Sequence, residues 1–343
     1  MSQHKIGKTA PARVTILDIA RVAGVSKSSV SRSLDERLPR SNSESAQRVR
    51  RVAQELGYVR DVSAASLRRG KTGMIGVIVP RLTDTVMAML YESLQRAAAR
   101  SGHFAIVATT DDTPEAGQRA ATTLLKRGVD GLVLSIARID DPFIFNLRER
   151  GVPHVLALRT DGHSPSSIGD DELGGYLATR HLLDLGHRHI GIIAGPSYAS
   201  SALGRLEGYR RALIEADIEY DLQYVTGSSF GIEAGARAAK QLLGLDTRPT
   251  AIFAVNDNTA IGAVSALGEM GLSIPDDISV VGYNDIPIVS KLPVPLTSVH
   301  VPFDQIAVEA MDLLLSDEAA SPREFLRKAL PSLMPRKSTR SIW

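Results

Sequence analysis

The chain has 343 residues, of which 43% are hydrophobic and 23% charged, and it contains no cysteine. This length suggests two or three domains, and the missing cysteines exclude disulfides, thiolate metal ligands and a cysteine nucleophile. No apolar run approaches about 18 residues and no apolar segment follows the basic start MSQHKIGKTAPAR, so we expect neither a transmembrane helix nor a signal peptide. These features predict a cytoplasmic protein.

The charge is distributed unevenly along the chain. Residues 1–72 hold 15 Lys and Arg against 6 Asp and Glu, a net charge of +9, whereas the remainder carries −7. A short basic module joined to a larger acidic one favours an anionic partner, such as a nucleic acid, for the first 72 residues only. A solvated basic tail would carry the same charge, so the charge by itself leaves both interpretations open.

The first predicted helix begins after Thr15. In the stretch TILD, the hydroxyl of Thr15 can cap the backbone N–H of Asp18, whose carboxylate can reach back, which is a capping-box pattern. Gly24 is suited to end this helix because it tolerates the left-handed conformation, and Ser26 can cap the next one. Two short helices joined by so tight a turn predict a helix-turn-helix.

The second helix lies in the stretch VSKSSVSRSL, residues 25–34. Lys27 and Ser31 lie four positions apart, as do Ser28 and Arg32, so these side chains share one polar, cationic face. Small hydroxyl groups let a helix enter a major groove deeply, and Lys and Arg can reach O6 and N7 of guanine. This face predicts DNA recognition; a capped, solvent-exposed helix is the alternative.

A third helix is expected to begin near Asn42 or Ser43 and to end at Gly57. Its apolar residues recur at positions i, i+3, i+4 and i+7, which is the pattern of a helix with one buried face. We expect a minimal core between the three helices, formed by Val25, Val30, Val49, Val52 and Leu56.

Three segments of this region resemble the start of regulators of the LacI/GalR (lactose-repressor) family. They are VTILDIARVAGVSKSSVSRSL, RVRRVAQELGYV and AASLRRGKTGMIGVIVP, and the resemblance continues through the chain from Val14. It implies that the positions matching Lys27, Ser28 and Arg32 read bases in the major groove. It also implies a hinge helix at about 62–67, whose Leu67 inserts into the minor groove and bends the operator. The candidate DNA contacts are Thr15, Ser26, Lys27, Ser28, Ser29, Ser31, Arg32 and Leu67.

The hinge departs from the family pattern. The usual Pro-Asn after the tyrosine is Arg60-Asp61 here, and the usual arginine of the hinge is Ala65, so hinge folding is left open. The stretch ASLRRGKT (65–72) nearly matches the phosphate-binding pattern G-x-x-x-x-G-K-[ST], but Ala65 replaces the first glycine. In addition, the predicted strand follows the motif, whereas a strand should precede it. Its basic residues are better interpreted as contacts to the DNA backbone or as a solvated linker.

From residue 73 onward, short apolar runs alternate with amphipathic helices. Continuously apolar strands are buried on both faces, as in a parallel sheet, so the pattern predicts a doubly wound α/β architecture long enough for two lobes. Ligands in such sheets bind beyond the carboxyl ends of the strands. The predicted strands are 74–80, 104–108, 131–136, 155–158, 190–194, 251–255 and 278–282; the predicted helices include 86–100, 172–185, 203–216 and 258–270.

Polar residues gather where these strands end, and carboxylates and amides on such loops suit hydroxyl-rich ligands. Asp and Asn also cap helices, and we favour the cap for Asp112, Asp257 and Asn258. The family resemblance implies a type I, periplasmic-binding-protein-like fold with an effector between the lobes, and an arginine matching Arg205 that clamps the ligand. The sequence departs from the family pattern at Asp84–Met87, Asp170-Asp171 and Leu158-Arg159. The identity of the effector is therefore left open. The candidate effector contacts are Asp84, Met87, Asp111, Arg159, Ser201, Arg205, Phe230, Asn256, Asn284, Asp285 and Phe303.

The resemblance implies an all-α DNA-binding domain joined to a two-lobed α/β effector domain. The expected function is a homodimeric, DNA-binding transcriptional regulator controlled by a sugar-like effector, with repression as the family default although some relatives activate. The expected divisions are a basic arm (1–13), a helix-turn-helix domain (14–60), a hinge and linker (61–72) and an effector domain (73–343), with an N-lobe of about 73–171 and 302–330 and a C-lobe of about 172–301 and 331–343.

Two other functional classes fit the sequence less well. A stand-alone sugar-binding protein of a transport system would need a secretion signal and no basic head. An enzyme is a more distant alternative, since the sequence has no G-x-S-x-G or H-E-x-x-H motif, and His187-Arg188-His189 is poorly spaced for a metal. We expect no cofactor, no metal, no catalytic residue and no coiled coil in the tail PSLMPRKSTRSIW, which lacks leucine heptads.

Overall fold

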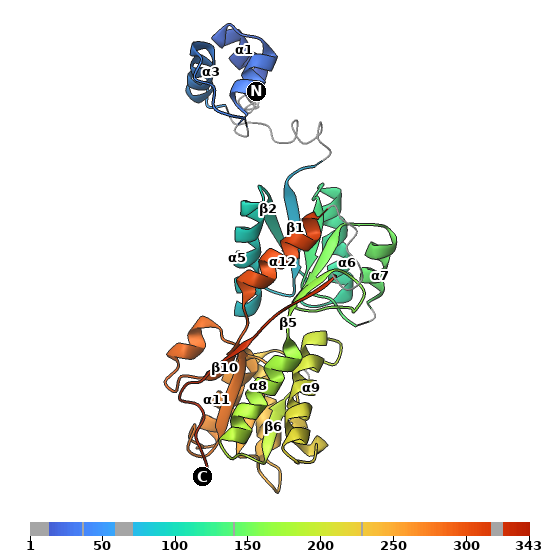
Figure 1. Cartoon of the computed structure of the whole chain (residues 1–343), viewed down its shortest axis with the longest axis vertical. Helices are drawn as coiled ribbons and strands as arrows, with labels where there is room; N and C mark the ends of the chain where they lie inside the picture. The colour runs from blue at the N-terminus through green and yellow to red at the C-terminus, as the bar shows by residue number, and fades with distance from the viewer. Residues whose placement is uncertain (1–13, 36–37, 59–70, 140, 228, 317–324) are drawn as a thin grey trace, which may run out of the picture. The chain divides into compact units, whose positions relative to one another are not determined.

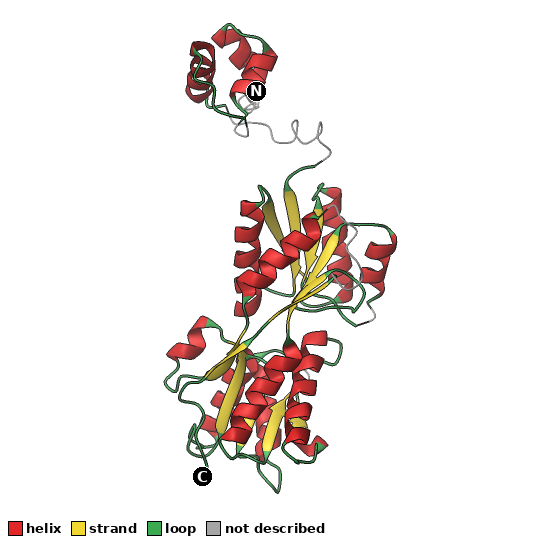
Figure 2. Ribbon diagram, in the orientation of Figure 1, coloured by secondary structure: helices red, strands yellow, loops and turns green. Residues whose placement is uncertain are grey.

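The computed structural model describes residues 14–35, 38–58, 71–139, 141–227, 229–316 and 325–343. The chain divides into two compact units, Met1–Gly70 and Lys71–Trp343 (Figure 1), whose helices and strands are distinguished in Figure 2. Within the described residues, no helix is both long and apolar enough to span a lipid bilayer. The predicted basic arm, Arg60-Asp61, Ala65 and the hinge helix with Leu67 lie outside the described residues.

The first unit contains the three predicted helices, α1 (Ile16–Ala23), α2 (Lys27–Ser33) and α3 (Glu44–Glu55). The predicted capping box at the start of α1 is confirmed, because Thr15 Oγ1 accepts from Asp18 N and Asp18 Oδ2 accepts from Thr15 N. Gly24 ends α1 in the left-handed conformation, with φ of 67°. Ser26 caps α2, and Ser43 caps α3. Local chemistry therefore sets the helix boundaries here.

A small apolar core holds these helices together. Its buried members come from all three helices, so each helix contributes one face to it, as the periodicity predicts. Val25, Leu34 and Leu56 pack against its edge and are only partly buried. The buried residues are Ile19, Ala23, Val30, Val49, Val52 and Ala53.

The second unit contains two six-stranded sheets, one in each lobe. The N-lobe sheet is parallel throughout, whereas the C-lobe sheet is parallel except for an antiparallel β10–β12 pair. The N-lobe order is β11 (Leu326–Ala329), β5 (Ser166–Gly169), β4 (His154–Ala157), β3 (Gly131–Leu134), β1 (Met74–Val79) and β2 (Phe104–Thr109); the C-lobe order is β12 (Ser332–Met334), β10 (Thr297–His300), β9 (Ser279–Asn284), β8 (Ala251–Ala254), β6 (Ile190–Ile193) and β7 (Val225–Thr226).

The apolar runs lie in strands that are buried on both faces, with one exception. Along β1, Val77 packs into one hydrophobic cluster and Ile78 into another, on opposite faces of the sheet. The exception is β2, where burial on both faces was expected but Phe104 is 59% exposed. This expectation is wrong because β2 lies at the edge of the sheet, and position in the sheet is not encoded in the local pattern.

Helices cover both faces of the N-lobe sheet. On one face, α5 (Thr85–Arg100) packs against α12 (Phe303–Leu315), and α12 also contacts β4 and β5. Residues of α6 (Pro114–Lys126) and α7 (Pro142–Glu149) join the hydrophobic cluster on the opposite face. This arrangement leaves the carboxyl ends of the strands free to face the C-lobe.

The C-lobe helices pack in two pairs, α8 (Asp171–Asp184) with α9 (Ser200–Glu215) and α10 (Ile232–Leu243) with α11 (Asp257–Glu269). Glycine makes the first pair possible, since a Cβ at Gly175 would collide with the carbonyl oxygen of Arg205, and one at Gly208 with that of Glu172. The backbones of α8 and α9 therefore touch, which places residues at the start of α8 beside residues of α9.

The described chain crosses between the lobes three times: between β5 and α8, between β10 and α12, and between β11 and β12 (Figure 1). The C-terminal tail then follows the C-lobe, where Ser338 is buried and the N–H of Ile342 donates to the carbonyl of Leu185. Each lobe is therefore built from discontinuous sequence, and loops from distant positions meet where the lobes face each other.

Candidate functional site

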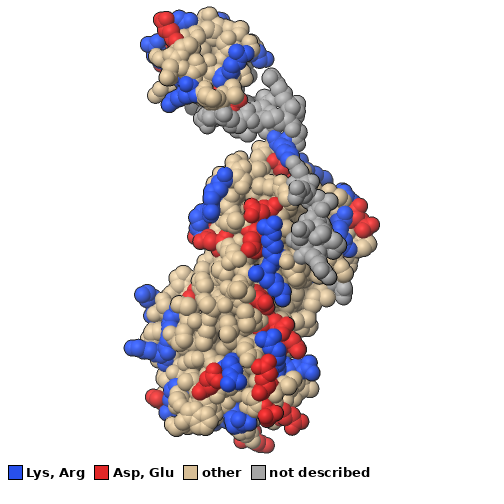
Figure 3. All heavy atoms as spheres, viewed as in Figure 1, with Lys and Arg blue, Asp and Glu red and all other residues tan. Residues whose placement is uncertain are grey.

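The polar face of α2 is open to solvent. Lys27, Ser28 and Arg32 are exposed and Ser31 is half-buried, while Val30 on the other face is fully buried. Among the charged side chains visible on this unit, Lys and Arg cover more of the surface than Asp and Glu (Figure 3). Cationic and small polar side chains therefore share one accessible surface, as DNA recognition requires. Their contact with DNA stays a prediction.

The remaining candidate DNA contacts, apart from Leu67, make hydrogen bonds at helix starts. Ser26 Oγ accepts from the backbone N–H of Ser29 at 3.1 Å and lies 2.8 and 2.9 Å from the hydroxyls of Ser28 and Ser29. Thr15 Oγ1 donates to Asp18 Oδ2 at 2.7 Å. These serines thus form one hydroxyl network at the start of α2, and the network orients the side chains that we expect to face DNA.

Between the lobes lies a cavity of about 580 Å³, lined by the loops at the carboxyl ends of the strands. This is the position that a doubly wound sheet offers to a ligand. Nine of the eleven candidate effector residues line it: Asp84, Met87, Asp111, Arg159, Ser201, Arg205, Phe230, Asn256 and Asn284.

The other two candidates do not line the cavity. Phe303 begins α12 and is 4% exposed, because its ring packs in the core between the N-lobe sheet and this helix. Asp285 accepts from Arg336 Nη2 at 2.6 Å and lies 3.4 Å from His300 Nδ1, so its carboxylate is committed inside the C-lobe. Neither partner of Asp285 is close to it in the sequence.

Helix capping and cavity lining coincide at two residues. Asp84 caps α5 through Val86 N at 3.1 Å, and Asn256 caps α11 through Thr259 N at 2.8 Å, yet both line the cavity. Burial raises the pKa of Asp84, and the hydrogen bonds from Val86 and Asn258 oppose this rise. The two roles are compatible because helix N-termini point into the cleft.

The three predicted caps at Asp112, Asp257 and Asn258 are wrong. The N-cap of α6 is Thr113, and that of α11 is Asn256. Asp112 and Asn258 instead line the cavity, and Asn258 Nδ2 donates to Asp84 Oδ1 at 3.2 Å. Asp257 is buried beneath the cleft, where its pKa rises to about 7 through burial. Each lies one or two positions from the capping residue. The residue types in the sequence do not show which of several neighbouring polar residues caps the helix.

Arg205 lines the cavity as the centre of a buried ion pair. It is 7% exposed, and its Nε and Nη1 donate to Asp171 Oδ1 and to the carbonyl of Val255, each at 2.8 Å. Its guanidinium carbon lies 3.7 Å from the ring centroid of Tyr283. Burial raises the pKa of the Asp171 carboxyl, and the charge of Arg205 opposes that rise. Arg205 is thus held in place by the protein, and three of the five N–H donors of its guanidinium take no part in these two bonds.

Arg159 forms a second ion pair at the cavity wall. Its Nη1 and Nη2 donate to the two carboxylate oxygens of Asp112 at 3.2 and 3.4 Å. The rings of Tyr198 and Phe230 lie 5.8 and 5.5 Å from its guanidinium carbon. Phe230 is half-buried and its carbonyl accepts from Asn256 Nδ2 at 3.0 Å, which fixes this aromatic surface beside the amide.

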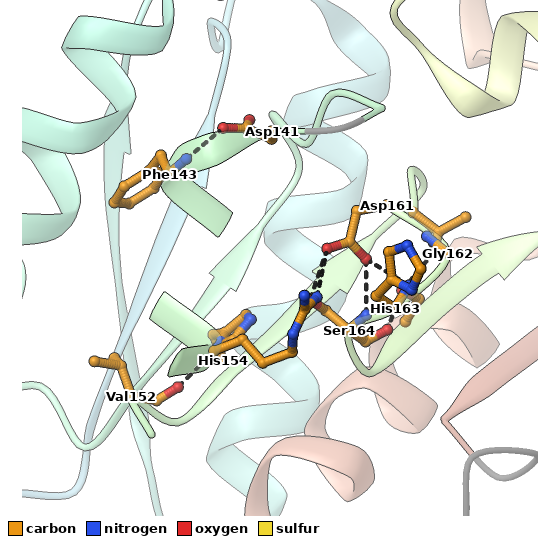
Figure 4. Close-up of polar contacts among 11 residues, drawn as sticks. Asp141, Phe143, Val152, His154, Asp161, Gly162, His163 and Ser164 are labelled. Carbon is orange, nitrogen blue, oxygen red and sulfur yellow. Dashed lines mark hydrogen bonds and ion pairs between the residues drawn. The ribbon is translucent and has the colours of Figure 1, made fainter. Parts of the chain in front are cut away.

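The loop that carries Arg159 is anchored by Asp161 (Figure 4). One carboxylate oxygen of Asp161 accepts from the backbone N–H groups of His163 and Ser164 at 2.9 and 2.7 Å, and the other accepts from Ser164 Oγ at 2.8 Å. Burial alone would raise the pKa of Asp161, but these hydrogen bonds and Arg148 outweigh it and lower the pKa. The ionised carboxylate therefore holds the turn between β4 and β5.

Several residues at the cavity were missed from the sequence. Tyr198, Arg81 and Glu233 line it as well. Tyr198 and Arg81 follow strands β6 and β1, so the expectation that polar residues after a strand face the cleft could have found them. The place of Glu233 depends on how α10 is oriented.

The histidine pair considered in the sequence is used inside the C-lobe. His187 forms hydrogen bonds with Thr250 and Ser279, and the described residues hold no cluster of three or more metal-ligating side chains.

Comparisons with known proteins agree with this geometry. Residues 15–61 match the family described as bacterial regulatory proteins, lacI family, and residues 179–339 match the periplasmic binding protein-like domain. The ribose operon repressor of Haemophilus influenzae is 33% identical over 334 residues, covering 96% of this chain and 99% of the relative. The repressor PurR of Actinobacillus pleuropneumoniae is 30% identical, also with 96% and 99% coverage.

Two solved structures are similar over both lobes. The Lac repressor dimer bound to operator and the anti-inducer ONPF has a TM-score of 0.84 at 28% identity, covering 96% of this chain and 99% of that one. A LacI family transcriptional regulator from Enterococcus faecium with bound ribose has a TM-score of 0.67 at 28% identity, covering 79% and 100%. This chain belongs to the lacI family of bacterial regulatory proteins, and it is a DNA-binding transcriptional regulator.

Proposed function

We propose that this regulator binds a palindromic operator as a homodimer, and that a small hydroxyl-rich effector in the cavity between the lobes controls its operator affinity. The single observation that carries the effector proposal is the cavity itself, which nine candidate residues from both lobes line. A ligand that touches both lobes favours one arrangement of them over another, and this difference is what couples two distant sites.

A dimer follows from the size of the DNA-reading surface. One helix of the length of α2 reads only a few base pairs, so two copies on a two-fold symmetric site multiply the specificity. The similar Lac repressor structure is a dimer bound to operator. We propose repression as the outcome, since the ribose operon and PurR relatives are repressors.

The charges in the cavity favour a ligand with hydroxyl groups over an anion. Among the described residues, three arginines line it: Arg159 and Arg205 are already paired with Asp112 and Asp171, and the charge of Arg81 is outnumbered by the lining carboxylates of Asp84, Asp111 and Glu233. Carboxylates and amides remain, and these accept from and donate to vicinal hydroxyls. The half-buried ring of Phe230 offers an apolar face for a sugar ring. A sugar or sugar derivative fits this combination, and one relative of known structure carries ribose.

We also propose that the cavity binds its ligand without transforming it, and that the protein acts in the cytoplasm, where operator DNA lies. The relatives support the first point because they are repressors. We propose the same domain divisions as in the sequence analysis. The two lobes are supported by the sheets, since the strands of residues 73–171 and β11 share one sheet and those of residues 172–301 and β12 share the other.

A thermal-shift screen of the full-length protein tests the effector proposal, using D-ribose, other sugars, sugar phosphates, sugar acids, nucleosides and purine bases. A ligand present at about 100 times its Kd stabilises the folded state by about 2.7 kcal/mol, which is readily measured. The stabilising compound should also change the affinity for an operator selected from random DNA, measured by fluorescence anisotropy.

A matched pair of variants places the binding site of that compound. Phe230→Ala should abolish the thermal shift, whereas Phe145→Ala, at an exposed phenylalanine of α7, should retain it. A panel without any stabilising compound, or a shift that survives Phe230→Ala, would contradict the proposal of a sugar-like effector in this cavity.

A further inference from the structure

Tyr198 belongs to the C-lobe, yet both its side chain and its backbone contact the N-lobe. Its hydroxyl donates to Asp112 Oδ2 at 2.7 Å, and its carbonyl accepts from the backbone N–H of Ile139 at 3.0 Å. Asp112 follows β2 and Ile139 follows β3, whereas Tyr198 follows β6. One loop of the C-lobe is therefore bound at two points to two loops of the N-lobe.

The acceptor of this tyrosine is a carboxylate that the N-lobe holds in place. Arg159 contacts both oxygens of Asp112, and Arg138 Nη2 donates to its carbonyl at 2.9 Å. Arg159 is 5% exposed, so the pair has little access to water. A hydroxyl that donates to an ionised, poorly solvated carboxylate makes a stronger hydrogen bond than one between neutral groups.

The ring of Tyr198 is held as well as its hydroxyl. The guanidinium carbon of Arg138 lies 3.9 Å from the ring centroid, the distance of a close cation–π contact. Asp112 itself has a φ of 59°, a left-handed conformation that costs a non-glycine residue energy, and Asp111 before it has a φ of 51°. The N-lobe therefore holds a strained loop in the position where its carboxylate meets Tyr198.

Other polar contacts between the lobes lack this support. Asn258 Nδ2 donates to Asp84 Oδ1 at 3.2 Å, and the N–H of Thr160 donates to Ser200 Oγ at 2.8 Å. Within the described residues, neither contact includes a cation or an aromatic ring. The Tyr198 contact is therefore expected to contribute most to holding the lobes together.

We propose that Tyr198, with Asp112, Arg159 and Arg138, forms a latch that holds the two lobes closed, in which Tyr198 is a positioning residue for the cavity. The latch is made of protein groups alone, so it acts whatever the identity of the effector, and this inference goes beyond the proposed function. The latch raises the fraction of protein in the closed arrangement. This fraction sets the apparent affinity of any ligand that binds one arrangement better than the other.

The absence of cysteine allows a direct test on the full-length protein without ligand or DNA. Cysteines at Glu115 in α6 and Glu207 in α9, both exposed, accept one nitroxide label on each lobe. Because α6 follows Asp112 and α9 follows Tyr198, the label-to-label distance, measured by double electron–electron resonance, reports opening on the side of the latch.

Tyr198→Phe removes the hydroxyl and keeps the ring. We expect the ratio of open to closed protein to rise by roughly ten-fold, seen as a population at longer distances. The matched control is Tyr176→Phe, because Tyr176 also donates to a carboxylate at 2.7 Å, but to Glu215 within the C-lobe. The control should keep the wild-type distances. A distance distribution for Tyr198→Phe that matches wild type would overturn the proposal.

Discussion

The DNA-binding domain and the effector domain build their candidate sites in opposite ways. The described candidate DNA contacts lie in one stretch, from Thr15 to Arg32, and local caps and a left-handed glycine position them. The cavity draws on residues from Pro80 to Asn284, brought together by two sheets in which the order of the strands differs from their order in the chain. A site formed by local structure can be read from the sequence, whereas a site formed by packing requires the fold.

The two sites also use positive charge differently. Lys27 and Arg32 are exposed, and no ion pair within the described residues includes them, so their charges are available to DNA. In the effector domain, Arg159 and Arg205 are buried and paired with carboxylates. The first arrangement suits an external anion, and the second holds the walls of the cavity in place.

Removing the buried cation at Arg205 should have the largest effect. Arg205→Ala leaves the Asp171 carboxylate buried without its partner, and breaking a buried pair in this way costs about 3–5 kcal/mol of unfolding free energy. Urea unfolding of the full-length protein measures it. Arg210→Ala, which removes an exposed cation from the same helix, should change stability by less than about 0.5 kcal/mol. Equal stabilities of the two variants would mean that Arg205 serves only the ligand.

Removing the exposed cation at Arg32 should instead affect DNA alone. Arg32→Ala is expected to weaken binding to a selected operator by about 1–3 kcal/mol and to relax base choice at one position. Its unfolding free energy should stay close to wild type because the side chain is exposed. Fluorescence anisotropy with the operator and its single-base variants measures both effects. Undiminished affinity and unchanged base preference would refute the proposed docking of α2.

The effector domain should also respond to pH through Asp257. Its folded pKa of about 7 exceeds the usual value, so the folded state binds more protons, and the unfolding free energy falls as pH rises from about 4 to about 7. The contribution is at most about 1.4 kcal/mol per pH unit. Urea unfolding between about pH 5 and pH 7 should show a shallower slope for Asp257→Asn than for wild type, while Asp246→Asn, at an exposed aspartate, should keep the wild-type slope. Parallel slopes for all three proteins would contradict this assignment.

The smallest expected effect is confined to the DNA-binding domain. Thr15→Ala removes the capping hydroxyl of α1 and should cost about 1 kcal/mol. Hydrogen exchange of the full-length protein should show faster exchange in residues 16–24 and no change in the effector domain. Thr122→Ala, which removes an exposed hydroxyl inside α6, is the control and should leave residues 16–24 unaffected. Unchanged exchange in Thr15→Ala would mean that tertiary packing, rather than the cap, holds α1.

Much of the fold follows from local patterns in the sequence. The TILD capping box, Gly24 and the apolar periodicity of α3 predicted the helix-turn-helix, since each of these signals acts within a few residues. Runs of apolar residues predicted most of the parallel strands, because a strand covered by helices on both sides needs no polar face. The short strands β5, β7, β10, β11 and β12 were missed, as they carry serine, threonine or basic residues, or are too short to form an apolar run.

The sequence by itself determined that a basic helix-turn-helix precedes a two-lobed α/β domain, and that polar residues gather at the strand ends. Only the tertiary structure decided which of those residues reach the cavity. Asp112 pairs with Arg159 and accepts a hydrogen bond from the hydroxyl of Tyr198, whereas Asp285 pairs with Arg336 inside the C-lobe. These partners lie between 47 and 86 positions apart in the chain. Composition specifies which polar groups are available, and packing determines which of them meet.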